Sequence, residues 1–186
     1  MLPPTHLAGG YLIGQLTKSR SKTFSLWTVV VSFFAIFPDI DLLWLWSNHR
    51  FSALHFPIFW VAIFVSAWLL SKLKNDKSIA TLGLAISLGG LIHIVMDSVG
   101  IFDGIYWLYP FSTARFSLLP VSVILPDHSL LTLFSVYLRH PIALLEAGIA
   151  AVAILHFLFR SDELVWLTAW LPTSITKKLP KRLKQR

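Results

Sequence analysis

Long apolar runs alternate with short polar segments along this 186-residue chain. Four of the runs come close to the 20 or so helical residues that cross the hydrocarbon core of a bilayer, and they predict membrane-spanning helices. They cover residues 24–46, 54–70, 79–99 and 141–159. An earlier run, 6–16, is too short to span alone, and Gly9, Gly10 and Gly14 would let it pack closely against a neighbouring helix.

The segments outside these runs complete the predicted architecture. Three prolines interrupt residues 100–140, which predicts an irregular capping or re-entrant region whose backbone is satisfied by protein or water. Residues 164–171 carry two Trp and are expected to lie in the membrane interface. The predicted fold class is therefore all-α: a polytopic helical membrane protein with one membrane domain, 1–171, and a basic tail, 172–186.

Composition supports a membrane protein. Hydrophobic residues make up 55% of the chain and charged residues only 13%, a balance that an ordinary water-soluble fold could not bury. Cysteine is absent, which excludes disulfides, thiolate metal ligands and cysteine nucleophiles. The formal net charge of +7 comes from short basic clusters between apolar runs, a pattern that membrane orientation explains better than nucleic-acid binding.

These basic clusters predict the orientation. If the four spans alternate, the clusters at 18–22 and 72–77, Arg160 and the tail all fall on one side. The positive-inside rule makes that side cytoplasmic. We therefore expect a protein of the cytoplasmic, or inner, membrane with its C-terminus in the cytoplasm. Arg50, Arg115 and Arg139 are left on the other side.

Ionisable residues of separate segments reach a similar depth. With a rise of 1.5 Å per residue, each lies about 18–25 Å above the cytoplasmic end of its own helix. They are His6, Asp39, His55, His93 and Glu146. A charged group at such a depth costs at least about 2.5–3.5 kcal/mol, so these side chains should face one another in a polar cavity. This site would open toward the non-cytoplasmic face.

Two motifs supply candidate metal ligands. In His93-Ile-Val-Met-Asp97 the i and i+4 positions place an imidazole and a carboxylate on one helix face, where both could bind one ion. Alternatively, Asp97 only orients His93. In Phe37-Pro38-Asp39-Ile40-Asp41 the proline favours a helix break, and two carboxylates follow in the opened turn. The alternative there is a helix end with Asp39 as a cap.

A third motif combines ligand and substrate chemistry. Residues 49–55 offer imidazoles at His49 and His55, with a guanidinium at Arg50 suited to bidentate phosphate contact. For His49 and Arg50 an interfacial basic loop is the alternative. Glu146 is either a further ligand or proton acceptor, or a structural hydrogen-bond partner inside the bundle.

In this order, the motifs resemble the YdjM family of membrane-bound, predicted metal-dependent hydrolases over about the first 115 residues. The resemblance rests on His6, Pro38-Asp39-Ile40-Asp41, His49-Arg50…His55, His93-x-x-x-Asp97 and Tyr109-Pro110-Phe111-Ser112. Leu42 stands where the family often has a histidine, and the His49–His55 interval is one residue longer than usual. The order is also similar to that of the zinc phospholipase C and P1 nuclease group.

Motifs and resemblance together predict a metal-dependent hydrolase of a phosphoester, with a lipid or lipid-linked substrate. Zinc, manganese or iron would be held by His6, Asp39, Asp41, His55, His93 and Asp97. The ion would activate a water and polarise the phosphoryl oxygen. Arg50 would steady the phosphate, Glu146 would be a further ligand or a proton acceptor, and His49 is a further candidate catalytic residue. Two alternatives are a cation or proton transporter, and a metal-independent lipid phosphatase, which would need an arginine that residues 86–92 lack.

Overall fold

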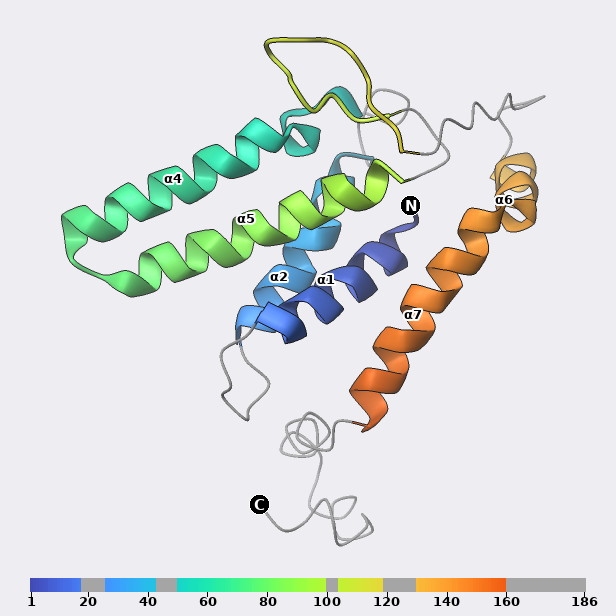
Figure 1. Ribbon diagram of the computed structural model, residues 1–186, viewed down its shortest axis with the longest axis horizontal. Coiled ribbons are helices and arrows are strands. Elements are labelled where there is room, and N and C mark those ends of the chain that lie inside the picture. The colour runs from blue at the N-terminus through green and yellow to red at the C-terminus, as the bar shows by residue number, and fades with distance from the viewer. Residues whose placement is uncertain (18–25, 43–49, 100–103, 119–129, 160–186) are drawn as a thin grey trace, which may run out of the picture.

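A computed structural model describes residues 1–17, 26–42, 50–99, 104–118 and 130–159. In this part of the chain the architecture is helical (Figure 1). Among the described residues, three helices are long and apolar enough to cross a membrane: α4 (Pro57–Lys74), α5 (Lys77–Asp97) and α7 (Pro141–Phe159). Helices are thus confirmed at the runs 54–70, 79–99 and 141–159, and each is a candidate membrane span.

Helices α4 and α5 form an antiparallel hairpin whose turn is specified locally. Helix α4 ends at Asn75, which adopts the left-handed conformation (φ 52°) common at helix C-termini. Asp76 is the N-cap of α5 and accepts a 2.8 Å hydrogen bond from the Ser78 N–H. The two helices pack closely because Gly83 and Gly90 face Ala67 and Trp60 of α4, with no room for a larger side chain.

Helices α1 (Pro3–Thr17) and α2 (Leu26–Ile36) form a shorter pair. As predicted, glycines on α1 allow the close approach: a Cβ added at Gly10 would lie 2.5 Å from Ala35 Cβ, and one at Gly14 would lie 3.0 Å from Thr28 Cα. The expected span over 24–46 is not a single long helix. Helix α2 ends before Pro38, and the 3₁₀ helix η1 (Phe37–Asp41) follows, so the helix break predicted at the proline is confirmed.

The pairs meet where α2 packs against α5, and α7 contacts α1 (Figure 1). A core of Trp60, Ile94 and Ile105 lies near the start of α4 and the end of α5. Residues 104–118 form an irregular segment closed by a bridge between Ile105 and Phe116. Helix α6 (Leu130–Arg139) precedes α7, so part of the expected capping region is helical. Its re-entrant path stays a prediction.

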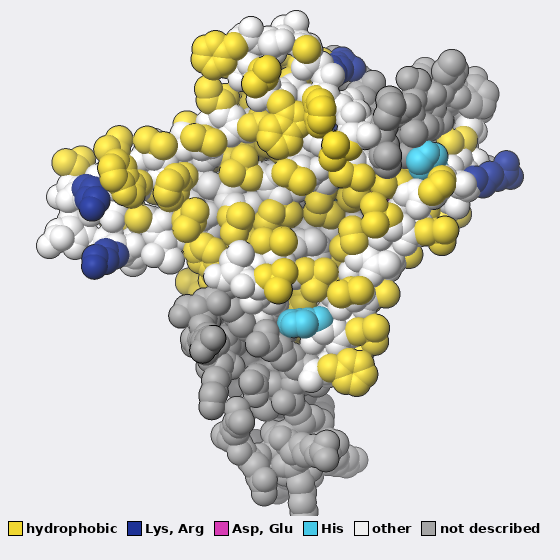
Figure 2. Space-filling model, in the orientation of Figure 1, with side chains coloured by type: hydrophobic (Ala, Val, Ile, Leu, Met, Phe, Trp, Pro, Cys, Tyr) yellow, Lys and Arg dark blue, Asp and Glu magenta, His cyan; other side chains and the backbone are white. Residues whose placement is uncertain are grey.

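The surface fits a bilayer environment. Hydrophobic side chains cover much of the face in Figure 2, whereas Lys and Arg lie at its margins, including the turn end of the α4–α5 hairpin. Among the residues drawn in colour, no acidic side chain shows on this face. Most of the acidic and histidine side chains predicted to meet are buried: those of His6, His55, His93 and Glu146 belong to residues at most 3% exposed, and the Asp39 side chain is 9% exposed.

Candidate metal centre

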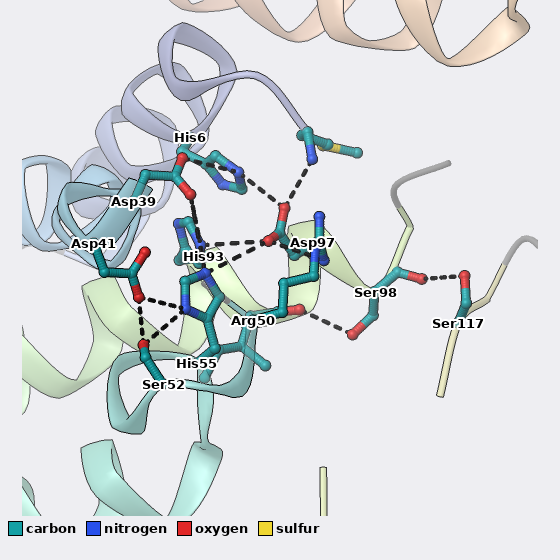
Figure 3. Close-up of polar contacts among 12 residues, drawn as sticks. His6, Asp39, Asp41, Arg50, Ser52, His55, His93, Asp97, Ser98 and Ser117 are labelled. Atoms are coloured by element: carbon teal, nitrogen blue, oxygen red, sulfur yellow. Dashed lines mark hydrogen bonds and ion pairs between the residues drawn. The ribbon is translucent and has the colours of Figure 1, made fainter. Parts of the chain in front are cut away.

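Four of the predicted ligand residues converge on one point. Asp39, His55, His93 and Asp97 each offer a ligand atom, and these atoms all lie within 4.8 Å of one another. Asp39 comes from η1, His55 from the end of the 3₁₀ helix η3 (Ala53–His55), and His93 and Asp97 from the last turns of α5. Figure 3 shows the four side chains pointing toward one another from these elements. We call them the His/Asp group.

The orientation of His93 is fixed by the end of α2. Its Nδ1 lies 2.9 Å from the Ala35 carbonyl oxygen near the end of α2, and Pro38, three residues further on, has no N–H to donate to that oxygen. A carbonyl only accepts hydrogen bonds, so this contact places the proton of a neutral His93 on Nδ1. The lone pair of Nε2 therefore faces the group, 3.6 Å from Asp39 Oδ1 and 3.5 Å from Asp97 Oδ2.

His55 is oriented in the same way by a carboxylate. Its Nδ1 lies 3.3 Å from Asp41 Oδ2, which also accepts a short hydrogen bond from the Ser52 hydroxyl. The carboxylate places the proton of a neutral His55 on Nδ1 as well. His55 Nε2 then faces His93 Nε2 at 3.2 Å. Two imidazole lone pairs would repel each other at this distance unless a metal ion or a proton lies between them.

The two carboxylates of the group are buried and incompletely satisfied. The side chain of Asp97 is 2% exposed and that of Asp39 is 9% exposed. Among the described residues, the Oδ2 atoms of both carboxylates are without a hydrogen bond. Asp97 Oδ2 does form a 3.2 Å ion pair with Arg50 Nη1. Buried carboxylates are stable when they are paired or bind a metal, so this chemistry fits a cation.

His6 and Asp41, also predicted as ligands, lie at the edge of the His/Asp group. His6 Nε2 contacts Asp97 Oδ1 at 3.1 Å, and its ring stacks on His93 with the centroids 4.0 Å apart. Asp41 lies on the Nδ1 side of His55. The α-amino group of Met1 also contacts Asp97 Oδ1, at 2.8 Å. These residues support the ligands, an arrangement that fixes ligand orientation in metal sites.

Glu146 contacts the start of α1. Its Oε2 accepts hydrogen bonds from the Leu2 N–H at 3.0 Å and from the Thr5 hydroxyl at 2.6 Å. Burial, together with hydrogen bonding to Glu146 and its charge, raises the pKa of Tyr137 on α6 well above its ordinary value. Tyr137 therefore remains neutral, and Glu146 links α7 to the helix that carries His6.

Sequence reasoning missed some of the groups that support the His/Asp group, and some of its predictions fall outside the described residues. The Ala35 carbonyl could not be found from residue identity, because every residue has a carbonyl. Ser52 could have been found, since it stands three residues before His55 and hydroxyl groups commonly orient such ligands. His49 lies outside the described residues, as do the basic tail and the interfacial segment expected at 164–171.

The donor set suits a divalent transition metal. Two imidazole nitrogens and two carboxylate oxygens are ligands that zinc accepts, and the histidines carry the outer hydrogen bonds typical of metal-bound imidazole. Despite the departures around it, the segment before α4 still delivers His55 to the group.

Comparison with known protein families gives a match over most of the chain. The model of a family described as YdjM inner membrane protein matches residues 1–171. No curated protein and no solved structure matches the chain.

Proposed function

This chain belongs to the YdjM inner membrane protein family, and from that premise we propose that it is a membrane-embedded, metal-dependent hydrolase of a phosphoester. One observation carries the proposal. The imidazoles of His55 and His93 direct their Nε2 atoms at each other across 3.2 Å, while both Nδ1 atoms face acceptors. This arrangement favours a bound cation, and zinc is the ion that we propose.

Four residues would hold the ion: Asp39, His55, His93 and Asp97. A divalent ion supplies Lewis acidity toward a phosphoryl oxygen and makes a water nucleophilic near neutral pH. The supporting residues keep the ligands in place. Asp41 and the Ala35 carbonyl fix the two imidazoles, and His6 bonds Asp97.

Arg50 is the residue that we assign to the phosphate. Its side chain is 11% exposed and lies against Asp97, so its guanidinium is at the edge of the His/Asp group. A guanidinium offers paired N–H donors that match two phosphate oxygens. Binding a phosphate would require Arg50 to exchange its contact with Asp97 for one with the substrate, which becomes easy once a cation neutralises Asp97.

Glu146 acts at a distance from the reaction in this proposal. Because it binds the Leu2 N–H and the Thr5 hydroxyl, it holds the first turn of α1 and with it His6. We therefore assign Glu146 a positioning role in place of the proton transfer expected from sequence.

The test is to measure metal content and hydrolysis together. The protein is purified in detergent, its bound metals are determined by elemental mass spectrometry, and hydrolysis of a chromogenic phosphodiester is followed with and without chelator. We expect near-stoichiometric metal and chelator-sensitive hydrolysis, both lost in His93→Ala and Asp97→Ala. His140→Ala is the matched control, because His140 bonds the Ile142 N–H between α6 and α7 and should leave both properties unchanged.

Other outcomes identify the alternatives. Hydrolysis that persists in chelator would favour a metal-independent phosphatase. Metal flux in reconstituted vesicles without any hydrolysis would favour a transporter. Full metal occupancy and full activity in His93→Ala would contradict the assignment of the His/Asp group.

A further inference from the structure

A groove separate from the His/Asp group runs between α1, α2 and α7. Its volume is about 610 Å³, within the roughly 300–1,000 Å³ of ligand-binding pockets. Apolar side chains such as Leu7, Phe33 and Ile154 form its walls. Small residues on two of the helices, Ala8 on α1 with Ala150 and Ala153 on α7, leave the space open.

The groove lining suits a hydrocarbon. Its two hydroxyl side chains already have partners: Ser32 donates to the Thr28 carbonyl at 2.7 Å, and the Tyr11 hydroxyl lies 3.0 Å from His156 Nδ1. A ligand in the groove would therefore gain apolar contact and no side-chain hydrogen bond that is not already made. In a membrane helix bundle, the abundant molecules with such a surface are lipid chains.

One end of the groove is lined by residues that lie close in the chain to residues of the proposed metal centre. Pro4 of α1 and Ile36 of α2 line this end, and they precede His6 and Asp39 by two and three residues. Seven residues along α1, Tyr11 marks the other end, about 10 Å away at 1.5 Å per helical residue. Asp39 is the more exposed of the two carboxylates in the group. A ligand along the groove would thus bring its polar end to Asp39.

We propose that this groove binds the hydrocarbon chain of a phosphorylated membrane lipid, with the phosphate at the Pro4–Ile36 end and the chain terminus near Tyr11. The inference rests on the proposed phosphoesterase function and names its substrate class. Lateral diffusion in the bilayer would bring such a lipid to the groove, and the chain would hold the phosphoester beside the His/Asp group.

Photo-crosslinking tests the groove without requiring hydrolysis. The full chain is placed in nanodiscs of a lipid without phosphate, digalactosyldiacylglycerol, that contain a small fraction of phosphatidic acid carrying a diazirine on one acyl chain. With the diazirine at the chain terminus, we expect labels around Tyr11 and Phe157. With the diazirine next to the carbonyl, we expect labels around Pro4 and Ile36. Unlabelled long-chain phosphatidic acid should compete, although digalactosyldiacylglycerol, which also has acyl chains, is in excess throughout.

Two neighbouring alanines of α7 provide matched variants. Ala150 lines the groove, whereas Ala151 is exposed and does not line it. We expect Ala150→Trp to reduce groove labelling severalfold and Ala151→Trp to leave it unchanged, with similar unfolding temperatures for both. Equal labelling of the two variants, or the reverse order of labels along the groove, would each overturn the proposal.

The result that would contradict the lipid groove is different from the result that would contradict the proposed hydrolase function. Ordered labelling without metal-dependent hydrolysis would support the lipid groove and remove the hydrolase assignment. Chelator-sensitive hydrolysis of a soluble phosphodiester without ordered labelling would overturn the groove and retain the hydrolase.

Discussion

The two helix pairs of this protein contribute to the same site in different ways. Helices α4 and α5 are long, with 18 and 21 residues, and both can cross a membrane. Helices α1 and α2 are shorter, with 15 and 11 residues. The long pair, together with η3 just before α4, contributes His55, His93 and Asp97 to the site. The short pair, together with η1 just after α2, contributes Asp39 and residues that support the group.

The two pairs therefore differ in how they fix the geometry of the site: one part of it is set within a single helix, and the other part depends on contacts between helices. His93 and Asp97 lie on consecutive turns of one helix, so their spacing is set as soon as α5 forms. Asp39 depends instead on the tertiary contact of α1, α2 and α5. The hairpin therefore supplies a partial site, and the short pair completes it.

The largest expected effect comes from removing a ligand of the short pair. We expect Asp39→Ala to lower zinc affinity more than about 100-fold, because loss of even an outer-shell partner costs about 10–100-fold. His6→Ala removes such a partner, since His6 bonds Asp97, and should fall within that range. Competition with a chromogenic chelator measures both affinities.

Equal losses of zinc affinity in Asp39→Ala and His6→Ala would instead indicate that His6 is itself a metal ligand. Wild-type affinity in Asp39→Ala would contradict the contribution of the short pair.

An intermediate effect is expected from separating α1 and α2. A Cβ at Gly10 would meet Ala35 Cβ at 2.5 Å and Ser32 Cα at 2.9 Å, so Gly10→Ala should destabilise the protein by about 1–3 kcal/mol. Gly148 on α7 has nothing within 4 Å of its added Cβ. Gly148→Ala should therefore be stabilising by about 0.5–1 kcal/mol. Unfolding in one detergent compares them, and equal stabilities would show that the α1–α2 contact is loose.

The smallest effect belongs to the exposed turn of the hairpin. Hydrogen bonds from the Ser78 hydroxyl and N–H hold the pKa of Asp76 below its ordinary value of 3.8. A lowered pKa in the folded state stabilises the protein above pH 3.8, and this stabilisation is lost as the pH falls through the lowered pKa. Asp76→Asn keeps a capping side chain that does not titrate.

Thermal unfolding of the wild type and Asp76→Asn between pH 6 and pH 3 measures this effect. We expect the unfolding temperature of the wild type to fall slightly more on acidification, because the other carboxylates titrate alike in both proteins. Parallel curves would show that the cap of α5 does not contribute to stability.

The sequence predicted the long pair better than the short one. Apolar length is visible in a sequence, and it predicted α4, α5 and α7. The run 24–46 continues on both sides of Pro38, so it suggested one long helix where η1 follows α2. Depth along each helix then predicted that residues from separate segments meet, which is confirmed for the His/Asp group.

The estimated depth of a residue in the membrane could not distinguish residues that join the His/Asp group from residues that only support it. Asp39 and Asp41 are two residues apart, but in a 3₁₀ helix with three residues per turn they point in different directions. Asp39 joins the group and Asp41 lies behind His55. The choice depends on how η1 is docked against η3, and that contact is not encoded in local spacing.

The contact between His93 and the Ala35 carbonyl has a consequence for how this site can change. Because the acceptor is main chain, no substitution of the Ala35 side chain removes it directly, although only a side chain about as small as alanine fits at this buried position against Gly10. The contact depends instead on which residue of the chain lies at the end of α2 opposite His93. Deleting one residue between Ala35 and Pro38 would turn another carbonyl toward His93 and shift Asp39 at the same time, so a small substitution can be tolerated where a length change cannot.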